Sequence, residues 1–93
     1  MKQSAYAFKH RVQLLLEAKG FSVAPIADSE YPVDLLGIRK GVTRGYRCKP
    51  HGKIYNEELQ KLRTFAHKLE IAVYIAKERP GREIVMYNAE EYE

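Results

Sequence analysis

Two neighbouring segments of the sequence decide the fold: Pro32-Val33-Asp34-Leu35-Leu36-Gly37-Ile38-Arg39 and, after Lys40-Gly41, Val42-Thr43-Arg44-Gly45-Tyr46-Arg47-Cys48-Lys49. Both segments contain the β-branched and aromatic residues that favour strands. Lys40-Gly41 suits the tight turn of a hairpin. We therefore predict an antiparallel hairpin with strands at residues 33–39 and 42–49.

The alternation of side chains along these strands brings charged residues together. Successive residues face opposite sides of a strand. In the first strand, Val33, Leu35 and Gly37 are therefore expected on one face, and Asp34, Leu36 and Ile38 on the other. In the second strand, Arg47 and Lys49 are expected on one face, and Tyr46 and Cys48 on the other. The carboxylate of Asp34, at the start of one strand, is then a close neighbour of Arg47 and Lys49 at the end of the next.

The rest of the chain predicts two helices and three more strands. One helix is capped by Ser4 and stops at Gly20, and the other is capped by Asn56. Their apolar positions are Ala5, Phe8, Val12, Leu15 and Leu16 in the first and Leu59, Leu62, Phe65, Ala66 and Leu69 in the second. The other strands are expected at residues 21–25, 71–76 and 83–87, before an acidic tail at 88–93. The order αβββαββ predicts an α/β fold, in which a small mixed β-sheet with one parallel crossover is flanked by helices.

Length and composition predict one globular domain. The chain has 93 residues, of which 45% are hydrophobic, and we assign residues 1–93 to a single domain. No apolar run is long enough for a membrane span, and no signal-type apolar segment follows Met1-Lys2. We therefore expect an intracellular protein, cytoplasmic or nucleoid-associated. Cys48 is the only cysteine, so no internal disulfide forms, and we expect its side chain to be buried.

Positive charge is concentrated in the middle of the chain. Residues 36–68 contain nine Lys/Arg and only two acidic residues. Such a segment is either simply solvated or attracts a phosphate backbone through charge and counterion release. The candidate nucleic-acid contacts are Arg44, Arg47, Lys49 and Lys53, expected in one row, with Lys9, Arg11 and His51 extending it, whereas Lys77, Arg79 and Arg82 are expected on a distant turn. The candidates for base stacking are Tyr31 and Tyr55, whereas Tyr46 and Tyr74 suit core packing.

Asp34 and Lys49 also indicate phosphodiester chemistry. Metal-assisted hydrolysis needs carboxylates that hold Mg²⁺ and a lysine that orients water or neutralises phosphate charge. Asp34 and Lys49 can fill these two catalytic roles, but Arg47 carries a fixed positive charge that repels a metal. The alternative is an ion pair of Asp34 with Arg47 or Lys49. Candidate replacements for the missing carboxylate are Glu58, in the first turn of the second helix, and Asp28 or Glu30 in the preceding loop.

Six motifs follow one another in a specific order: Gly20-Phe21, Ser29, Pro32-Val33-Asp34-Leu35-Leu36, Arg47-Cys48-Lys49, Glu58-Leu59-Gln60-Lys61-Leu62 and Ile71-Ala72-Val73-Tyr74-Ile75-Ala76. In these motifs nearly the whole chain resembles the archaeal Holliday junction resolvases, which are restriction-endonuclease-like (PD-(D/E)xK) nucleases. The resemblance implies that nuclease fold, a Mg²⁺ site that includes Asp34, DNA as the partner, and a homodimer.

The sequence departs from this family at the catalytic positions. Arg47 replaces the glutamate two residues before the lysine, and Lys9 or His10 stands where the family's first helix carries a glutamate. We therefore expect a nuclease-fold protein that binds structured or duplex DNA, with weak or lost Mg²⁺-dependent cleavage. Two alternatives stay open: an active Mg²⁺-dependent endodeoxyribonuclease that uses Asp34, Lys49 and Glu58, and a protein-interaction module without catalysis.

Overall fold

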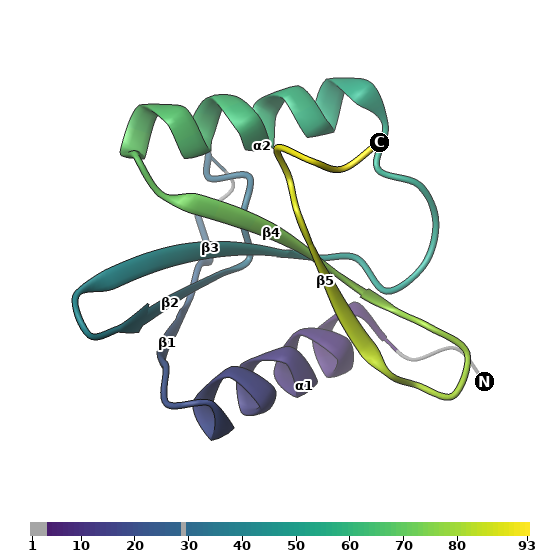
Figure 1. The fold of residues 1–93 in the computed structure, drawn as a ribbon. Coiled ribbons are helices and arrows are strands. Elements are labelled where there is room, and N and C mark those ends of the chain that lie inside the picture. The colour runs from purple at the N-terminus through teal and green to yellow at the C-terminus, as the bar shows by residue number, and fades with distance from the viewer. Residues whose placement is uncertain (1–3, 29) are drawn as a thin grey trace.

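The computed structural model describes residues 4–28 and 30–93, and this part of the chain forms two helices and five strands (Figure 1). In chain order they are α1 (Ala5–Ala18), β1 (Ser22–Pro25), β2 (Leu35–Arg39), β3 (Val42–Cys48), α2 (Asn56–Leu69), β4 (Ala72–Glu78) and β5 (Ile84–Asn88). The predicted αβββαββ order is confirmed. Neither helix in this part of the chain is long and apolar enough to cross a membrane. The motif residue Ser29 lies outside the described residues.

The five described strands form one mixed sheet in the order β1-β2-β3-β4-β5. Strands β1, β2 and β3 pair antiparallel, β3 and β4 pair parallel, and β4 and β5 pair antiparallel. The predicted hairpin turn is confirmed, because Lys40 and Gly41 have φ angles of 52° and 79°, and a two-residue turn of this kind requires positive φ at both positions. α2 is the crossover that the parallel β3–β4 pair needs.

The two helices cover opposite faces of the sheet (Figure 1). On the α1 side the core contains Phe8, Val12, Leu16, Phe21, Leu35, Tyr46, Cys48 and Ala76. On the α2 side it contains Val33, Ile54, Leu59, Leu62, Ala66, Val73, Ile75 and Ala89. Alternation along each strand therefore decides which helix a side chain meets. The predicted burial of Cys48 is confirmed.

β2 begins two residues later than predicted, and this changes the face of Val33. The strand starts at Leu35, which packs on the α1 side, whereas Val33 packs on the α2 side. The prediction that these two residues share a face is wrong, because strict alternation holds only within the strand. β4 is longer than predicted and continues beyond Ala76, so that Lys77 belongs to it.

The helix ends agree only in part with the prediction. The Ser4 hydroxyl accepts a backbone hydrogen bond and caps α1 as predicted. The predicted cap of α2 by Asn56 is wrong: Tyr55 occupies the N-cap position without a side-chain hydrogen bond, and Asn56 is the first helical residue. Ala5 and Leu69, which we predicted in the apolar stripes, are exposed, because each is the terminal residue of its helix.

The acidic C-terminal segment packs back against α2. Ala89 is buried, and Arg63 of α2 donates from Nε to the Ala89 carbonyl oxygen at 2.8 Å and from Nη2 to the Tyr92 carbonyl oxygen at 2.8 Å. The Glu90 carboxylate contacts the imidazole Nε2 of His67 in α2. Arg63, one of the nine cations of the basic middle segment, is thus held by the chain's own C-terminal backbone.

Candidate functional site

Asp34 is fixed in the sheet just before β2 begins. Its N–H donates to the Tyr46 carbonyl oxygen at 2.8 Å, and its carbonyl oxygen accepts from the Ile26 N–H at 2.8 Å. Its side-chain Oδ2 accepts from the Cys48 backbone N–H at 2.7 Å. The carboxylate is therefore positioned against the end of β3, where the sequence placed it.

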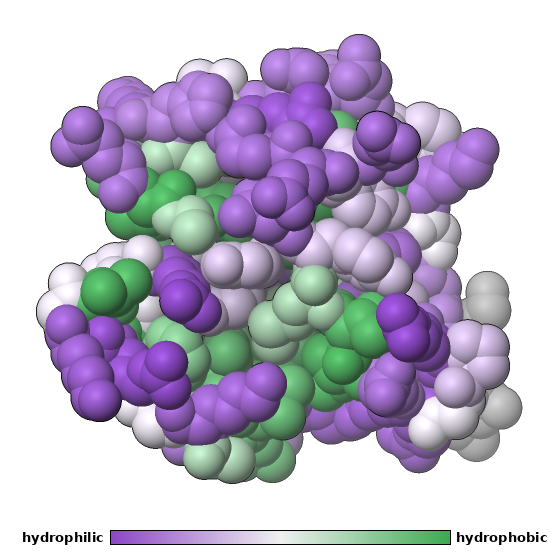
Figure 2. Space-filling model, in the orientation of Figure 1, coloured by the Kyte–Doolittle hydropathy of each residue, from purple (hydrophilic) through white to green (hydrophobic). Residues whose placement is uncertain are grey.

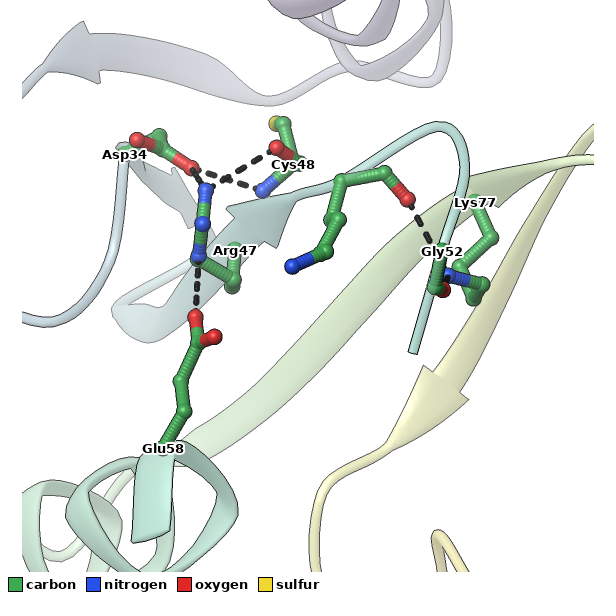
Figure 3. Close-up of polar contacts among 7 residues, drawn as sticks. Asp34, Arg47, Cys48, Gly52, Glu58 and Lys77 are labelled. Carbon is green, nitrogen blue, oxygen red and sulfur yellow. Dashed lines mark hydrogen bonds and ion pairs between the residues drawn. The ribbon is translucent and has the colours of Figure 1, made fainter. Parts of the chain in front are cut away.

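Arg47 bridges Asp34 and Glu58 (Figure 3). Its Nη1 donates to Asp34 Oδ2 at 3.0 Å and to the Cys48 carbonyl oxygen at 3.1 Å, and its Nε donates to Glu58 Oε2 at 2.5 Å. Of the two ion pairs that the sequence left open as alternatives, the one between Asp34 and Arg47 forms, and Glu58 reaches it from the first turn of α2. The planar guanidinium suits this double contact because its donors point in several fixed directions. We call Asp34, Arg47 and Glu58 the Arg47 bridge.

The local environment fixes the charge states around the bridge. Partial burial acts to lower the pKa of Arg47, but the hydrogen bond that Arg47 donates to Glu58 and the charge of Asp34 outweigh it, so the pKa is raised. Burial, reinforced by the charge of Asp34, raises the pKa of the Cys48 thiol to about 12. Arg47 therefore stays charged, and Cys48 is not a thiolate nucleophile near neutral pH.

The Arg47 bridge does not fit a divalent metal ion. Asp34 and Glu58 come from the sheet and from the helix, as two metal-binding carboxylates would, but the guanidinium already occupies Asp34 Oδ2 and Glu58 Oε2. Within residues 4–28 and 30–93, no three His, Cys, Asp or Glu side chains gather closely enough to hold a metal. Because a fixed positive charge repels Mg²⁺, the wild-type side chains do not form the metal site that the resemblance implied.

Lys77 is a neighbour of this site that the sequence interpretation missed. Cys48 and Ala76 are register partners in the parallel β3–β4 pair, so Lys49 and Lys77 come next at the same edge of the sheet. Lys77 Nζ donates to the Gly52 carbonyl oxygen at 2.6 Å and to the Lys49 carbonyl oxygen at 3.4 Å (Figure 3). Partial burial, followed by the charges of Lys49 and Arg47, lowers the pKa of Lys77.

The prediction that Lys77 lies on a distant turn is therefore wrong. The signal that could have placed it is the crossover itself, because two parallel strands joined by a helix end at the same edge of the sheet. The lysine that follows the apolar residues of β4 then lies beside the lysine that follows β3. Arg79 and Arg82, in contrast, do belong to the β4–β5 connection.

Two other candidate cations pair with one carboxylate on the α1 side. Arg11 forms an ion pair with Glu78, and His51 Nε2 lies 3.4 Å from Glu78 Oε1. The hydrogen bond from Arg11 is the main cause that lowers the pKa of Glu78. Arg11 and His51 are therefore held by β4 and do not extend a row of cations from Arg47.

Lys9 and Lys53 remain close to the ends of the hairpin strands. A small cleft between α1 and the start of β2 is lined by Lys9, His10 and Leu35. The charge of Lys9 also acts on Cys48. Lys53 is exposed in the loop that follows β3. Lys9 and His10, one of which stands where the resemblance implies a first-helix glutamate, thus both line this cleft beside the start of β2.

Arg44 lies on the other face of the sheet from Arg47. Its Cζ lies 5.6 Å from the centre of the Phe21 ring and 5.5 Å from the centre of the Tyr74 ring, both on the α1 side. Residues three apart in a strand face opposite sides. The prediction of one row through Arg44, Arg47, Lys49 and Lys53 is therefore wrong.

The tyrosines lie where the sequence placed them. Tyr46 is buried and stacks on Tyr74, with 5.8 Å between the ring centres. Tyr55 and Tyr31 are exposed, and the Tyr31 ring packs edge-on against Phe65 of α2. Tyr55, in the loop before α2, presents the more exposed ring.

This arrangement of sheet and helices is a Holliday junction resolvase-like nuclease fold. Among the solved structures that it resembles is Hjc, a Holliday junction resolvase from the archaeal hyperthermophile Archaeoglobus fulgidus, with a TM-score of 0.79 and 17% sequence identity. The match covers 95% of this chain and 75% of the Hjc chain. No protein-family model matches the sequence, and no curated protein is significantly similar to it. The resemblance drawn from the motifs is thus confirmed as a shared fold.

Proposed function

We propose that this protein binds structured or duplex DNA through the side chains around the Arg47 bridge, and that Mg²⁺-dependent cleavage is weak or lost. One observation carries the proposal: the Arg47 guanidinium lies between Asp34 and Glu58, where two carboxylates would otherwise share a metal ion. Lys49 and Lys77 lie beside it at the same sheet edge. The site therefore keeps cations that attract phosphate while its carboxylates are already neutralised.

The chemistry of these residues favours binding to the DNA backbone. Lys49 and Lys77 provide compact positive charges, and Lys53 adds another from the loop after β3. Contacts to phosphate position a protein on DNA without reading its sequence. Binding should therefore depend steeply on salt and little on base sequence. We also propose that the protein is a homodimer, which light scattering with and without DNA would test. We place its action inside the cell, in the cytoplasm or on the nucleoid.

A four-way DNA junction and a matched duplex, both labelled, test the proposal with and without Mg²⁺ or Mn²⁺. We expect both DNAs to bind at low salt in the absence of metal, and neither to be cut at a rate above the protein-free control. Absence of binding at low salt would contradict the proposal and favour the interaction module.

The position of Glu58 favours one second candidate, an active endonuclease. Glu58 and Asp34 contact the same guanidinium, so movement of Arg47 would leave two carboxylates facing one region. Cleavage that requires Mg²⁺ or Mn²⁺ and disappears in Glu58→Gln would establish this candidate. The matched control is Glu57→Gln, because Glu57 is exposed in the same helical turn and pairs with Lys61 on the helix surface.

A further inference from the structure

The tip of the β2–β3 hairpin carries a second group of cations, far from the Arg47 bridge. The group consists of Arg39, Lys40, Arg44 and Lys19, the last at the end of α1, and we call it the hairpin patch. Figure 2 shows hydrophilic residues around the outer end of this hairpin, at the lower left, next to an apolar area. Val42, at the tip, is 53% exposed.

The patch is built around one aromatic ring. Arg39 Cζ lies 4.6 Å from the centre of the Phe21 ring, and Arg44 approaches the same ring at 5.6 Å. Arg39 Nη1 also donates to the Lys19 carbonyl oxygen at 2.8 Å, which satisfies a terminal carbonyl group of α1. Two guanidinium groups are thus held close together by packing and by a backbone hydrogen bond.

Within residues 4–28 and 30–93, the charge of the hairpin patch is not compensated by a carboxylate. Among the described residues, none of the four cations of the hairpin patch forms an ion pair, whereas Arg47 pairs with two carboxylates and Arg79 with Glu83. Helix capping and ring contacts explain where Arg39 and Arg44 lie, but they leave their charge unneutralised. Lys40 is exposed at the turn. Like charges held together without a counterion attract an external polyanion.

We propose that the hairpin patch is a second contact for the phosphate backbone of DNA, separate from the one at the Arg47 bridge. This inference rests on the proposed function and adds a surface to it. β2 joins the two regions: Arg39 lies five positions after Asp34, or roughly 17 Å along the strand. The patch faces the α1 side and the bridge faces the α2 side, so a DNA segment at one surface leaves the other available for a second segment.

Binding of a labelled four-way junction across a salt series tests the hairpin patch. The test variant is Arg39→Gln/Lys40→Gln. The matched control is Arg79→Gln/Arg82→Gln, which removes the same charge from the β4–β5 connection, where both arginines lie near carboxylates. We expect the test variant to bind on the order of tenfold more weakly at moderate salt, and to flatten the plot of log affinity against log salt by about two units. The control should bind like the wild type.

A single variant, Lys40→Gln, and a comparison of DNA with anionic lipid vesicles show whether the hairpin patch binds DNA. Lys40→Gln alone should give about half of the loss in slope without changing the melting temperature, because Lys40 is exposed at the turn. If the wild type binds the junction but both double variants bind like it, the hairpin-patch proposal fails and the proposed function stands. If the wild type does not bind at low salt, the proposed function fails. If Arg39→Gln/Lys40→Gln reduces binding to phosphatidylserine vesicles but not to DNA, a membrane surface replaces DNA as the partner of the patch.

Discussion

The two ends of β3 hold positive charge in two different ways. At its C-terminal end Arg47 is neutralised by Asp34 and Glu58, and at its N-terminal end Arg44 packs with Arg39 on an aromatic ring without a carboxylate. Neutralised charge fixes one element to another, whereas charge without a counterion is left to attract a ligand. A count of cations along the sequence therefore overstates the charge that a partner would meet.

The largest expected effect comes from reversing the charge at the bridge. Arg47→Glu would place a third carboxylate between Asp34 and Glu58, in a region whose two acids already point at one position. Three carboxylates of this kind suit a hard divalent cation. We expect Mn²⁺ or Mg²⁺ affinity to rise on the order of a hundredfold over the wild type, measured by calorimetry.

The control for this reversal removes one of the three acids. Arg47→Glu/Glu58→Gln should lose most of the gained metal affinity, and Arg47→Glu/Glu57→Gln should keep it, because Glu57 points to solvent from the same helical turn. Equal metal binding by wild type and Arg47→Glu would show that the two carboxylates do not converge as described. The metal should also raise the melting temperature of Arg47→Glu, since binding only to the folded state stabilises it.

The sequence predicted the hairpin and the proximity of Asp34 to Arg47 because both depend on local periodicity. Alternation along the hairpin strands and the turn at Lys40-Gly41 are enough to bring Asp34 next to Arg47. Lys77 was misplaced because its position depends on a parallel register between strands separated by a helix. The hydrogen bonds of Arg63 to backbone carbonyls of the C-terminal segment left no charge pattern in the sequence, since the acceptors are not side chains.

The second expected effect concerns the cations that flank the bridge. Lys49→Gln/Lys77→Gln should weaken binding to the junction on the order of tenfold at moderate salt, because two ammonium groups at one sheet edge are lost. Arg79→Gln/Arg82→Gln again serves as the control. Salt-dependent binding curves measure the effect.

Lys77→Gln removes a hydrogen bond to Gly52, so the melting temperature of each variant is measured beside its binding curve. A Lys49→Gln/Lys77→Gln variant that binds like the control would place the DNA contact elsewhere, with the hairpin patch as the remaining surface.

The third prediction compares the two kinds of cation by their effect on stability. Arg47→Met should destabilise the fold by about 1–2 kcal/mol, because Asp34 and Glu58 lose their shared partner while still partly covered. Lys40→Met should change stability by less than about 0.5 kcal/mol, because Lys40 is exposed and unpaired among the described residues. Urea unfolding measures both values. Adding Glu58→Gln to Arg47→Met should recover part of the loss, and equal losses for Arg47→Met and Lys40→Met would mean that the bridge adds no stability.

The smallest expected effect concerns how the free energy of unfolding depends on pH below about pH 5. It arises from the ion pair of another neutralised cation, Arg11, with Glu78. Its hydrogen bond to Glu78 holds the pKa of that carboxyl below the usual value in the folded protein. A carboxylate with a lowered folded-state pKa stabilises the fold above its unfolded-state pKa, and this contribution disappears as the pH falls through the folded-state value. Wild type should therefore lose stability between about pH 5 and pH 3, and Glu78→Gln should lose less over the same interval.

Urea midpoints across this range measure the difference, with Glu83→Gln as the control because Glu83 is exposed beside Arg79. If wild type and Glu78→Gln follow parallel curves, the ion pair of Arg11 with Glu78 contributes nothing to stability in solution.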